Sequence, residues 1–451
     1  MTATPKPASL FQSTFTRANL REIFDEFISD GAAVGRDGVS VEKFSDRIDS
    51  EMDIILRKVN DCSYEFTAYR EKLISKGALK PPRQISIPTV RDKIVLKYLS
   101  EFLAKIYPDH VSRVPHSTIK RVHEVSSSRL SSDNYLRLDI ESYFPSIDHR
   151  ILLRILRRRI RKKQLLHLLE NALITPTGRK KTADTLNECG IAQGLSISNI
   201  LSSIYLADID TSLSQDPNVE YIRFVDDILM IGSQVDITSL AVSTPRLLKS
   251  KRKIKCHTVG DGSKSVIVPL ADGIDYLGYR FRLSEIEVRE ASFKKMFSNI
   301  IRLVSAMKYA NNKGPLIWKL NLRISGCQFL GRKIGWLFFF SQSKNTQQLK
   351  QLDAFVNRQA SMVLSPADQG RLKRFVKAYH EIRFNADQTR YFPNFDDFDD
   401  EQKRHQIGIL IPKKTSAEIG ALSPAELDQL FRKCINREIA DLEKDMMEAF
   451  S

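Results

Sequence analysis

The residues best suited to chemistry are two adjacent aspartates, Asp226 and Asp227, in the stretch YIRFVDDILMIG (221–232). Strand-like apolar runs flank them and are separated by only two residues, which predicts a β-hairpin with the pair at its turn. Carboxylates flanked by apolar strands repel each other and are costly to desolvate unless a cation joins them. Two other pairs, Asp396-Asp397 and Asp399-Asp400, lie in a polar stretch and predict a solvated loop or helix start.

A third candidate carboxylate lies in NYLRLDIESYFPSIDHRIL (134–152). Leucines alternate with other residues, so Asp139 is predicted on a strand, on the face opposite the leucines. Asp148 precedes a run with helical spacing, where an aspartate most often caps the helix. We therefore assign Asp139 to function and Asp148 to capping. Clustered carboxylates suit Mg²⁺, and two such ions can activate an attacking hydroxyl and stabilise a leaving pyrophosphate.

The stretch GIAQGLSISNILSSIYLADID (190–210) combines a glycine-rich turn with a helix. Gly190 and Gly194 flank Gln193, so the backbone of this loop can come close to a ligand. The apolar residues that follow have the spacing of one helix face, with Ser196 or Ser198 as candidates for its N-terminus.

The elements that must position these residues form three zones. Residues 18–120 have a mainly helical pattern, interrupted at 31–40 and by the loop LKPPRQISIP (79–88). Residues 134–282 alternate short apolar strands with helices, which predicts an α+β unit around an antiparallel sheet. Helical periodicity returns after about residue 290. The first 16 residues are predicted to be a flexible arm.

Composition narrows the class of protein. Of 451 residues, 42% are hydrophobic and 27% charged, which is typical of a folded protein with two to four subdomains. No apolar run is long enough to span a bilayer, and the start lacks a signal-peptide core. The five cysteines are widely spaced, which argues against a zinc site and favours the cytoplasm.

A net charge of +16 predicts an anionic partner. The excess is concentrated in three runs, at 154–164, 178–181 and 249–255. One such run is often only a solvated helix face, but three within about a hundred residues favour a nucleic-acid track. Candidate contacts in the first run are Arg154, Arg157, Arg158, Arg161 and Lys162.

Taken together and in this order, DIESYF, QGLSIS and FVDD resemble motifs A, B and C of the reverse transcriptases. Phe224 stands where the family more often has tyrosine. The flanks extend the likeness: GAAVGRDGVSVEKF resembles the N-terminal motif of group II intron-type enzymes, RQISIPTVRDKIVLKYL their fingers motif, and IDYLGYRF the primer-grip strand. The likeness covers roughly residues 17–285, and the remainder is similar only as a thumb.

This resemblance implies a right-hand polymerase fold within the α+β class. The implied order is a flexible arm (1–16), helical fingers (17–128), a palm (129–285) with a fingers segment near 150–185, a helical thumb (286–385) and a helical C-terminal extension (386–451). The implied activity is RNA-directed DNA synthesis with two Mg²⁺ ions, for which Mn²⁺ could substitute.

The resemblance also implies roles for single residues. Asp139 and Asp226 would bridge both metal ions, Asp227 would support the site, and the carbonyl of Ile140 would complete a coordination shell. Phe144 matches the steric gate that excludes a ribose 2′-hydroxyl. The other implied nucleotide contacts are Gln193 and Gly194 in the pocket, Lys80 and Arg83 in the fingers loop, and Lys264 near the pyrophosphate.

The C-terminal third, from 320–342 through PNFDDFDD, looks most similar to defence-associated and abortive-infection reverse transcriptases of bacteria. Such enzymes imply an RNA template or noncoding RNA, dNTPs, a DNA product, and a companion protein or homo-oligomer as partners. Two alternatives stay open: a retron or group II intron-type mobile-element enzyme, and a nucleic-acid-binding scaffold without catalysis. Template, priming mode and oligomeric state are not encoded in any motif.

Overall fold

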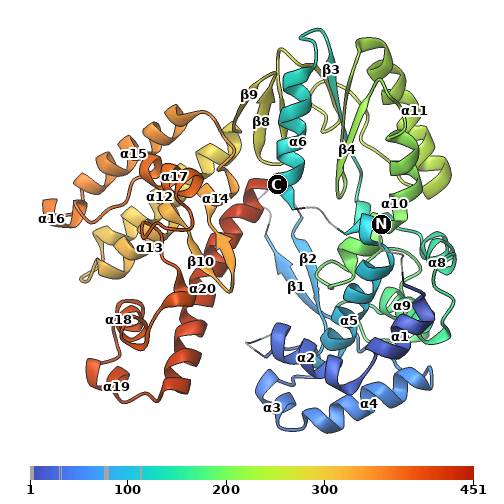
Figure 1. Ribbon diagram of the computed structural model, residues 1–451, viewed down its shortest axis with the longest axis horizontal. Helices are drawn as coiled ribbons and strands as arrows, with labels where there is room; N and C mark the ends of the chain where they lie inside the picture. Colours follow the sequence, from blue (N-terminus) through green and yellow to red (C-terminus); the bar gives the residue numbers. More distant parts are fainter. Residues whose placement is uncertain (1–4, 30, 32, 76–80, 112–113, 451) are drawn as a thin grey trace. The chain divides into compact units, whose positions relative to one another are not determined.

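The computed structural model describes residues 5–29, 31, 33–75, 81–111 and 114–450 (Figure 1). The chain forms two compact units. The first consists of Met1–Val114 and Ser132–Val268, and the second of Pro115–Ser131 and Pro269–Ser451. The predicted palm, 129–285, is therefore divided between them at its two ends. None of the described helices is long and apolar enough to cross a membrane.

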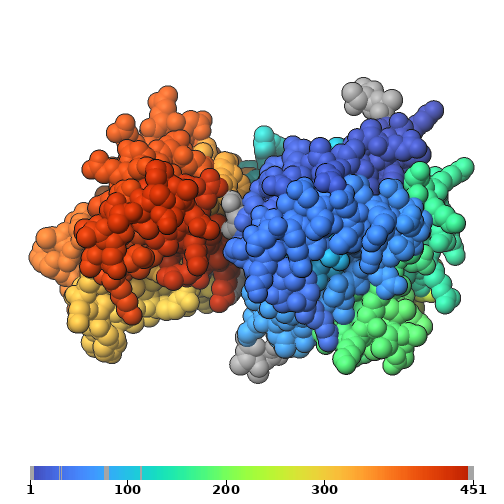
Figure 2. All heavy atoms as spheres, turned by 90° about the horizontal axis from the view of Figure 1, so that it is seen from below, coloured from blue at the N-terminus to red at the C-terminus, as the bar shows by residue number. Residues whose placement is uncertain are grey.

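The first unit begins with helices that cover the face seen in blue in Figure 2. They are α1 (Pro7–Thr14), α2 (Arg17–Phe27), α3 (Val41–Ser45), α4 (Ile48–Asn60) and α5 (Val90–Ile106). The prediction of a flexible arm over residues 1–16 is wrong for the described part of that segment. Phe11 and Phe15 are buried and make edge-to-face contacts with the ring of Tyr98 on α5, and this apolar contact orders α1.

A β-hairpin precedes α5. Strands β1 (Arg70–Ile74) and β2 (Arg83–Ile87) pair antiparallel, so the segment predicted as a loop over 79–88 ends in a strand. The sequence of β2 alternates polar and apolar residues, a strand signal that the two preceding prolines obscure. The side chain of Thr89 accepts a hydrogen bond from Asp92 N and starts α5.

The centre of the first unit is a four-stranded sheet in the order β4-β5-β3-β6. Its strands are β3 (Asn134–Asp139), β4 (Glu220–Phe224), β5 (Asp227–Gly232) and β6 (Val266–Pro269). The β3–β5 and β4–β5 pairs are antiparallel, which confirms the predicted α+β class. The helices between these strands are α7 (Tyr143–Ser146), α8 (His149–Arg157), α9 (Lys163–Ile174), α10 (Ser198–Leu213) and α11 (Gln234–Arg252).

The second unit combines small sheets with helices. Strands β7 (Ile274–Tyr276), β8 (Tyr279–Arg282) and β9 (Glu285–Val288) form one sheet, against which α6 (Pro115–Ser128) packs. Strands β10 (Cys327–Phe329) and β11 (Arg332–Ile334) form a hairpin. The main helices are α12 (Glu290–Lys308), α13 (Gly314–Ser325), α14 (Trp336–Phe339), α15 (Thr346–Ser361), α16 (Pro366–Gln369), α17 (Phe375–Phe384), α18 (Asp400–Leu410), α19 (Ser416–Gly420) and α20 (Pro424–Phe450).

The C-terminal helices share a core with the rest of the second unit. Phe329 and Ile334 of the β10–β11 hairpin belong to one buried cluster with Phe431 and Ile435 of α20. The segment predicted as an extension, 386–451, therefore packs on the predicted thumb, 286–385, through a common apolar core.

Candidate active site

Asp139 and Asp227 lie side by side on the central sheet. Asp139 ends β3 and is the direct cross-strand partner of Asp227, the first residue of β5. Directly paired residues point to the same face of a sheet. Leu136 and Leu138 are fully buried on the opposite face, as the alternation predicts.

The turn of the β4–β5 hairpin consists of Val225 and Asp226, because Phe224 pairs with Asp227. The prediction that both aspartates occupy the turn is wrong by one residue. Val225 has a φ of 56°, a left-handed conformation that a β-branched residue adopts only under strain. Two hydrogen bonds hold the turn: Arg223 Nη1 donates to the carbonyl of Val225 (2.8 Å), and Ile140 N donates to the carbonyl of Asp226 (3.3 Å).

The two adjacent aspartates have different partners. Asp227 accepts two hydrogen bonds from Arg137, at 2.8 Å from Nε and 2.7 Å from Nη2. Asp226 has no ion-pair partner among the described residues. Burial raises the pKa of Asp226, the charge of Asp139 raises it further, and the charges of Arg83 and Lys264 oppose the rise. Burial also raises the pKa of Asp227, to about 6, against the opposing effect of Arg137.

Two basic side chains approach Asp139. Lys264 Nζ lies 3.4 Å from its Oδ2, and His257 Nε2 lies 3.3 Å from the same atom. The Asp139 backbone N–H donates to Ser265 Oγ at 3.1 Å, which attaches the end of β3 to the segment that carries Lys264. The resemblance to reverse transcriptases implied a place for Lys264 near the pyrophosphate of a bound nucleotide. In the structure Lys264 lies beside the carboxylate cluster.

Two of the three carboxylates, those of Asp139 and Asp226, suit the binding of a hard divalent cation better than all three together. No group of three or more His, Cys, Asp or Glu side chains in the described part of the chain has a metal-binding arrangement. Asp227 is directed to Arg137, whereas neither Asp139 nor Asp226 has an arginine partner among the described residues. Their repulsion, visible in the raised pKa of Asp226, is what an oxygen-binding cation would relieve.

The predicted nucleotide-binding loop packs on the β1–β2 hairpin. The carbonyl of Gln193 accepts a hydrogen bond from Ser86 N at 2.7 Å. Gly194 has a φ of 101°, and a Cβ there would lie 2.7 Å from Ile85 Cγ2, so only glycine permits this approach. Arg83 begins β2, and its charge reaches Asp226. Lys80 lies outside the described residues.

Phe144 lies on α7, half-buried, next to the same loop. Its carbonyl accepts a hydrogen bond from Ile191 N at 2.8 Å, and Gly190 N donates to Ile147 at 2.8 Å. These bonds attach α7 to the segment that carries Gln193. The helix after the loop begins at Ser198, whose hydroxyl donates to Ala192 O, so neither predicted serine serves as a side-chain N-cap.

Asp148 caps α8, as predicted. Its Oδ1 accepts a hydrogen bond from Ile151 N at 3.0 Å, and its Oδ2 lies 2.6 Å from Lys253 Nζ. Although partial burial opposes ionisation, these partners hold the pKa of Asp148 below its usual value.

The basic run at 154–164 divides among several environments. Arg154 and Arg158 line a cavity of about 390 Å³, whereas Arg157 and Arg161 are exposed and do not line it. Arg159 donates to the carbonyl of Ile106 at 3.0 Å and lies over the ring of Tyr107, which is a packing role. The Lys162 ammonium lies 5.8 Å from the ring centroid of Phe11.

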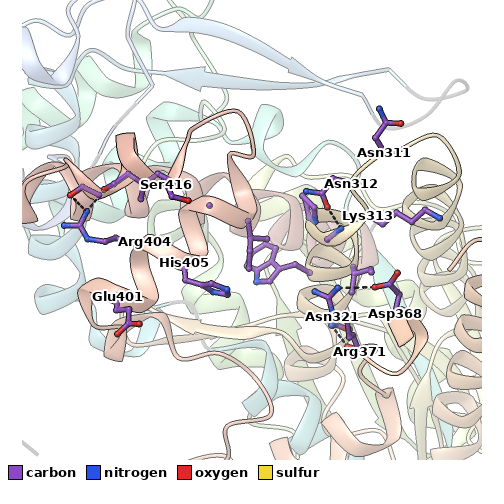
Figure 3. A pocket seen from close by; sticks show the side chains of 18 residues that line it. Asn311, Asn312, Lys313, Asn321, Asp368, Arg371, Glu401, Arg404, His405 and Ser416 are labelled. Carbon is purple, nitrogen blue, oxygen red and sulfur yellow. Dashed lines mark hydrogen bonds and ion pairs between the residues drawn. The ribbon is translucent and has the colours of Figure 1, made fainter. Parts of the chain in front are cut away.

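The second unit has a larger cavity, of about 1300 Å³, and none of the predicted site residues lines it (Figure 3). Its arginines already have partners within the protein. Arg371 pairs with Asp368 at 3.1 Å, and Arg404 donates to the carbonyls of Ile419, Gly420 and Leu422. These contacts occupy guanidinium N–H groups that a ligand would otherwise use.

Three residues that lie near the aspartates were not predicted as site residues from the sequence. Arg137 is two positions before Asp139 on the same strand face, so the strand period could have indicated it. Arg223 pairs with Asp210 of α10 and holds the hairpin turn. His257 comes from a segment more than a hundred residues after Asp139, and nothing in its local sequence marks it.

Parts of this chain are similar in sequence to known proteins. Residues 74–281 match the family model described as reverse transcriptase (RNA-dependent DNA polymerase). Protein YkfC of Escherichia coli (strain K12) is 24% identical over 347 residues, which cover 66% of this chain and 87% of YkfC. The COX1/OXI3 intron 2 protein of Saccharomyces cerevisiae is 21% identical over 319 residues, which cover 56% of this chain and 36% of that protein.

The solved structures that match this chain include two telomerases. That of Candida albicans with a fragment of telomeric RNA has a TM-score of 0.41 and 12% identity, over 90% of this chain and 69% of that one. The apo telomerase of Candida tropicalis has a TM-score of 0.40 and 12% identity, over 86% of this chain and 69% of that one.

Proposed function

We propose that this chain, whose residues 74–281 match the reverse transcriptase family model, copies RNA into DNA with two divalent cations held by Asp139 and Asp226. The observation that carries this proposal is the arrangement at the hairpin. Asp226 occupies a strained turn beside Asp139 without a cationic partner, whereas Asp227 is neutralised by Arg137.

The protein groups have distinct tasks in this proposal. Asp139 and Asp226 supply carboxylate oxygens, and the carbonyl of Ile140 adds a neutral oxygen. Asp227, held by Arg137, would fix the start of β5 and so the orientation of the neighbouring Asp226 side chain. When bound, two Mg²⁺ ions, or Mn²⁺ in their place, would activate a 3′-hydroxyl and stabilise the leaving pyrophosphate.

Basic side chains near the carboxylates would orient the incoming dNTP. The charges of Lys264 and Arg83 lower the pKa of Asp226, so both side chains are within electrostatic reach of a triphosphate bound there. Lys80 is proposed to act with Arg83. Gln193 and Gly194 would bound the pocket, because their loop is hydrogen-bonded to β2.

The proposal is tested by incorporation of labelled dTTP on an oligo(dT)-primed poly(rA) template by purified protein. We expect incorporation that requires Mg²⁺ or Mn²⁺ and is lost in Asp226→Asn. The matched control is Asp399→Asn, which removes one charge from the second Asp-Asp region. Absence of incorporation by a folded wild-type protein on every primer offered would favour the alternative, a nucleic-acid-binding scaffold without catalysis.

The biological role is a finer proposal. We propose an antiphage reverse transcriptase that works with a noncoding RNA or a companion protein, and the resemblance of the C-terminal motifs to those of defence-associated enzymes supports this role. The match to an intron-encoded yeast protein favours a second candidate, a mobile-element enzyme of intron or retron type. Sequencing nucleic acid that copurifies from cells separates them. A small RNA encoded beside this gene supports defence, and intron RNA supports the mobile element.

A further inference from the structure

Two basic runs that are about a hundred residues apart in the sequence meet in the first unit. One lies on α8 and the other at the end of α11. Together they line the cavity of about 390 Å³, which none of the candidate active-site residues lines. Its lining includes six basic side chains and one acidic side chain: Arg150, Arg154, Arg158, Lys251, Arg252, Lys253 and Asp148.

The walls of this cavity are fixed to each other through α10. The buried hydroxyl of Tyr205 accepts a hydrogen bond from Asp148 N (3.2 Å) at the start of α8. The same hydroxyl donates to the carbonyl of Arg252 (2.8 Å) at the end of α11. Arg252 is buried, donates to Tyr205 O at 2.6 Å and pairs with Asp208. Its side chain therefore builds the cavity and is not available to a ligand.

Four of the other cations have no carboxylate partner. Arg150, Arg154, Arg158 and Lys251 are exposed and form no ion pair with any described residue. The three arginines recur every four residues. Arg150 and Arg154 lie on α8, and Arg158 is its C-cap residue with a helical backbone, so the three share one face, about 6 Å apart along the helix axis. Like charges at this spacing destabilise a helix, and a purely structural face would intersperse acids. In the larger cavity of the second unit, by contrast, Arg371 pairs with Asp368 and the guanidinium of Arg404 is bonded to backbone carbonyls.

We propose that this cavity binds the phosphodiester backbone of a nucleic-acid strand, at a site separate from the candidate active site. Guanidinium groups match phosphate oxygens two at a time, and their spacing along α8 is of the same order as that of phosphates in an extended strand. The cavity contacts phosphates and no base, so binding is independent of base sequence. The identity of the strand as template or carried RNA rests on the proposed function.

The test is direct binding of short labelled oligo(U) RNA and oligo(dT) DNA to the full chain over a series of salt concentrations. EDTA is present and dNTPs are absent, so the result does not depend on catalysis. The variant is Arg150→Ala/Arg154→Ala/Arg158→Ala. The charge-matched control is Lys43→Ala/Arg57→Ala/Lys105→Ala, which removes three exposed cations from α3, α4 and α5. Thermal melting confirms that each variant is folded.

We expect the cavity variant to lose about tenfold or more in affinity at physiological salt, with the salt slope reduced by roughly two to three. The control should lose much less, and Arg150→Lys/Arg154→Lys/Arg158→Lys should retain most of the slope because the charges remain. A loss confined to oligo(U) identifies RNA as the strand, and an equal loss with oligo(dT) identifies a site for either strand.

Equal losses in the cavity variant and the control would overturn the proposal, because total charge alone would then explain binding. Failure of the proposed function gives a different result. A wild-type protein that binds both oligonucleotides through this cavity but incorporates no dNTP would refute the polymerase and leave the phosphate site standing.

Discussion

At two β-hairpin turns of this protein lies one aspartate of an Asp-Asp pair, and the carboxylate meets different partners at each turn. In the β4–β5 hairpin, Asp226 is part of the turn and has no cationic partner. In the β10–β11 hairpin, Asp396 approaches the turn from outside. It accepts hydrogen bonds from Leu330 N (2.6 Å) and Gly331 N (2.9 Å), two residues with φ of 50° and 68°.

Asp399, in the second C-terminal pair, is also satisfied locally. Asp399 caps α18, accepts a hydrogen bond from Gln402 N at 2.8 Å and completes a capping box with the Gln402 side chain. This confirms the prediction of a helix start for the second pair. The dipeptide alone therefore does not mark chemistry. Its role depends on whether backbone donors, an arginine or nothing in the protein neutralises each carboxylate.

The largest effect is expected for Asp226→Asn, which tests whether the carboxylate without a cationic partner takes part in the reaction. We expect dNTP incorporation to fall on the order of 10³-fold, because an amide cannot replace a carboxylate as a cation ligand. Thermal stability should stay equal or rise, since a buried charge without a partner is removed. Incorporation and melting temperature are measured on the same preparation. Retention of wild-type activity would remove Asp226 from the mechanism.

The second prediction concerns the partner that distinguishes Asp227 from Asp226. Arg137→Met leaves Asp227 buried without its cation and should cost about 3–5 kcal/mol in urea unfolding. With Asp227→Asn added, most of this cost should disappear. A double variant no more stable than Arg137→Met would show that the loss comes from packing.

The pH dependence of that variant has a defined sign. The folded pKa of Asp227 is about 6 in the wild type, above the reference value of 3.8, and removal of Arg137 raises it further. A raised carboxyl pKa favours the folded state at low pH, and this advantage is lost as pH rises through the folded pKa. The deficit of Arg137→Met should therefore shrink as pH falls from neutrality towards 4. A deficit that does not change with pH would contradict this.

The third prediction concerns Phe144, which we propose to contact the sugar of a nucleotide bound near the β4–β5 hairpin. Phe144→Ala should reduce discrimination against ribonucleotides by at least about tenfold, because the ring no longer opposes a 2′-hydroxyl. Incorporation of UTP relative to dTTP measures this. Phe144→Tyr keeps a ring of similar size and serves as the matched control. An unchanged sugar preference in Phe144→Ala would assign Phe144 to packing.

The smallest effect is expected at the start of α18. Asp399→Ala should cost about 1 kcal/mol of stability through loss of the α18 cap. It should leave dNTP incorporation unchanged, because the carboxylate serves only the helix end. Urea unfolding and incorporation assays measure both. A large loss of activity at unchanged stability would show that the two Asp-Asp regions are not as different as their partners indicate.

Much of the candidate site could be predicted because its signals are local. The alternation around Asp139 identified a strand and its face, and the two apolar runs around Asp226-Asp227 identified a hairpin. The helical run after Asp148 identified a cap. In each case a period of two or about 3.6 residues is a property of the backbone and can be read within ten residues.

Contacts between distant segments could not be predicted in this way. The turn begins at Val225 because β5 pairs with β3 in a register that includes Asp227. Residues 7–14 are helical because Tyr98 packs on Phe11 and Phe15. The basic run at 154–164 divides because Arg154 and Arg158 line one cavity, whereas Arg159 packs on Ile106 and Tyr107.

By itself, the sequence determined the class of fold, the order of the three motifs and the excess of positive charge. Only the tertiary structure decided which carboxylates are neutralised and which remain, and that Arg154 and Arg158 meet Lys251 in one cavity. The physical reason is that charges act through space. A carboxylate has the same chemistry in every stretch of sequence, and its pKa and role depend on the groups that folding places within a few ångströms of it.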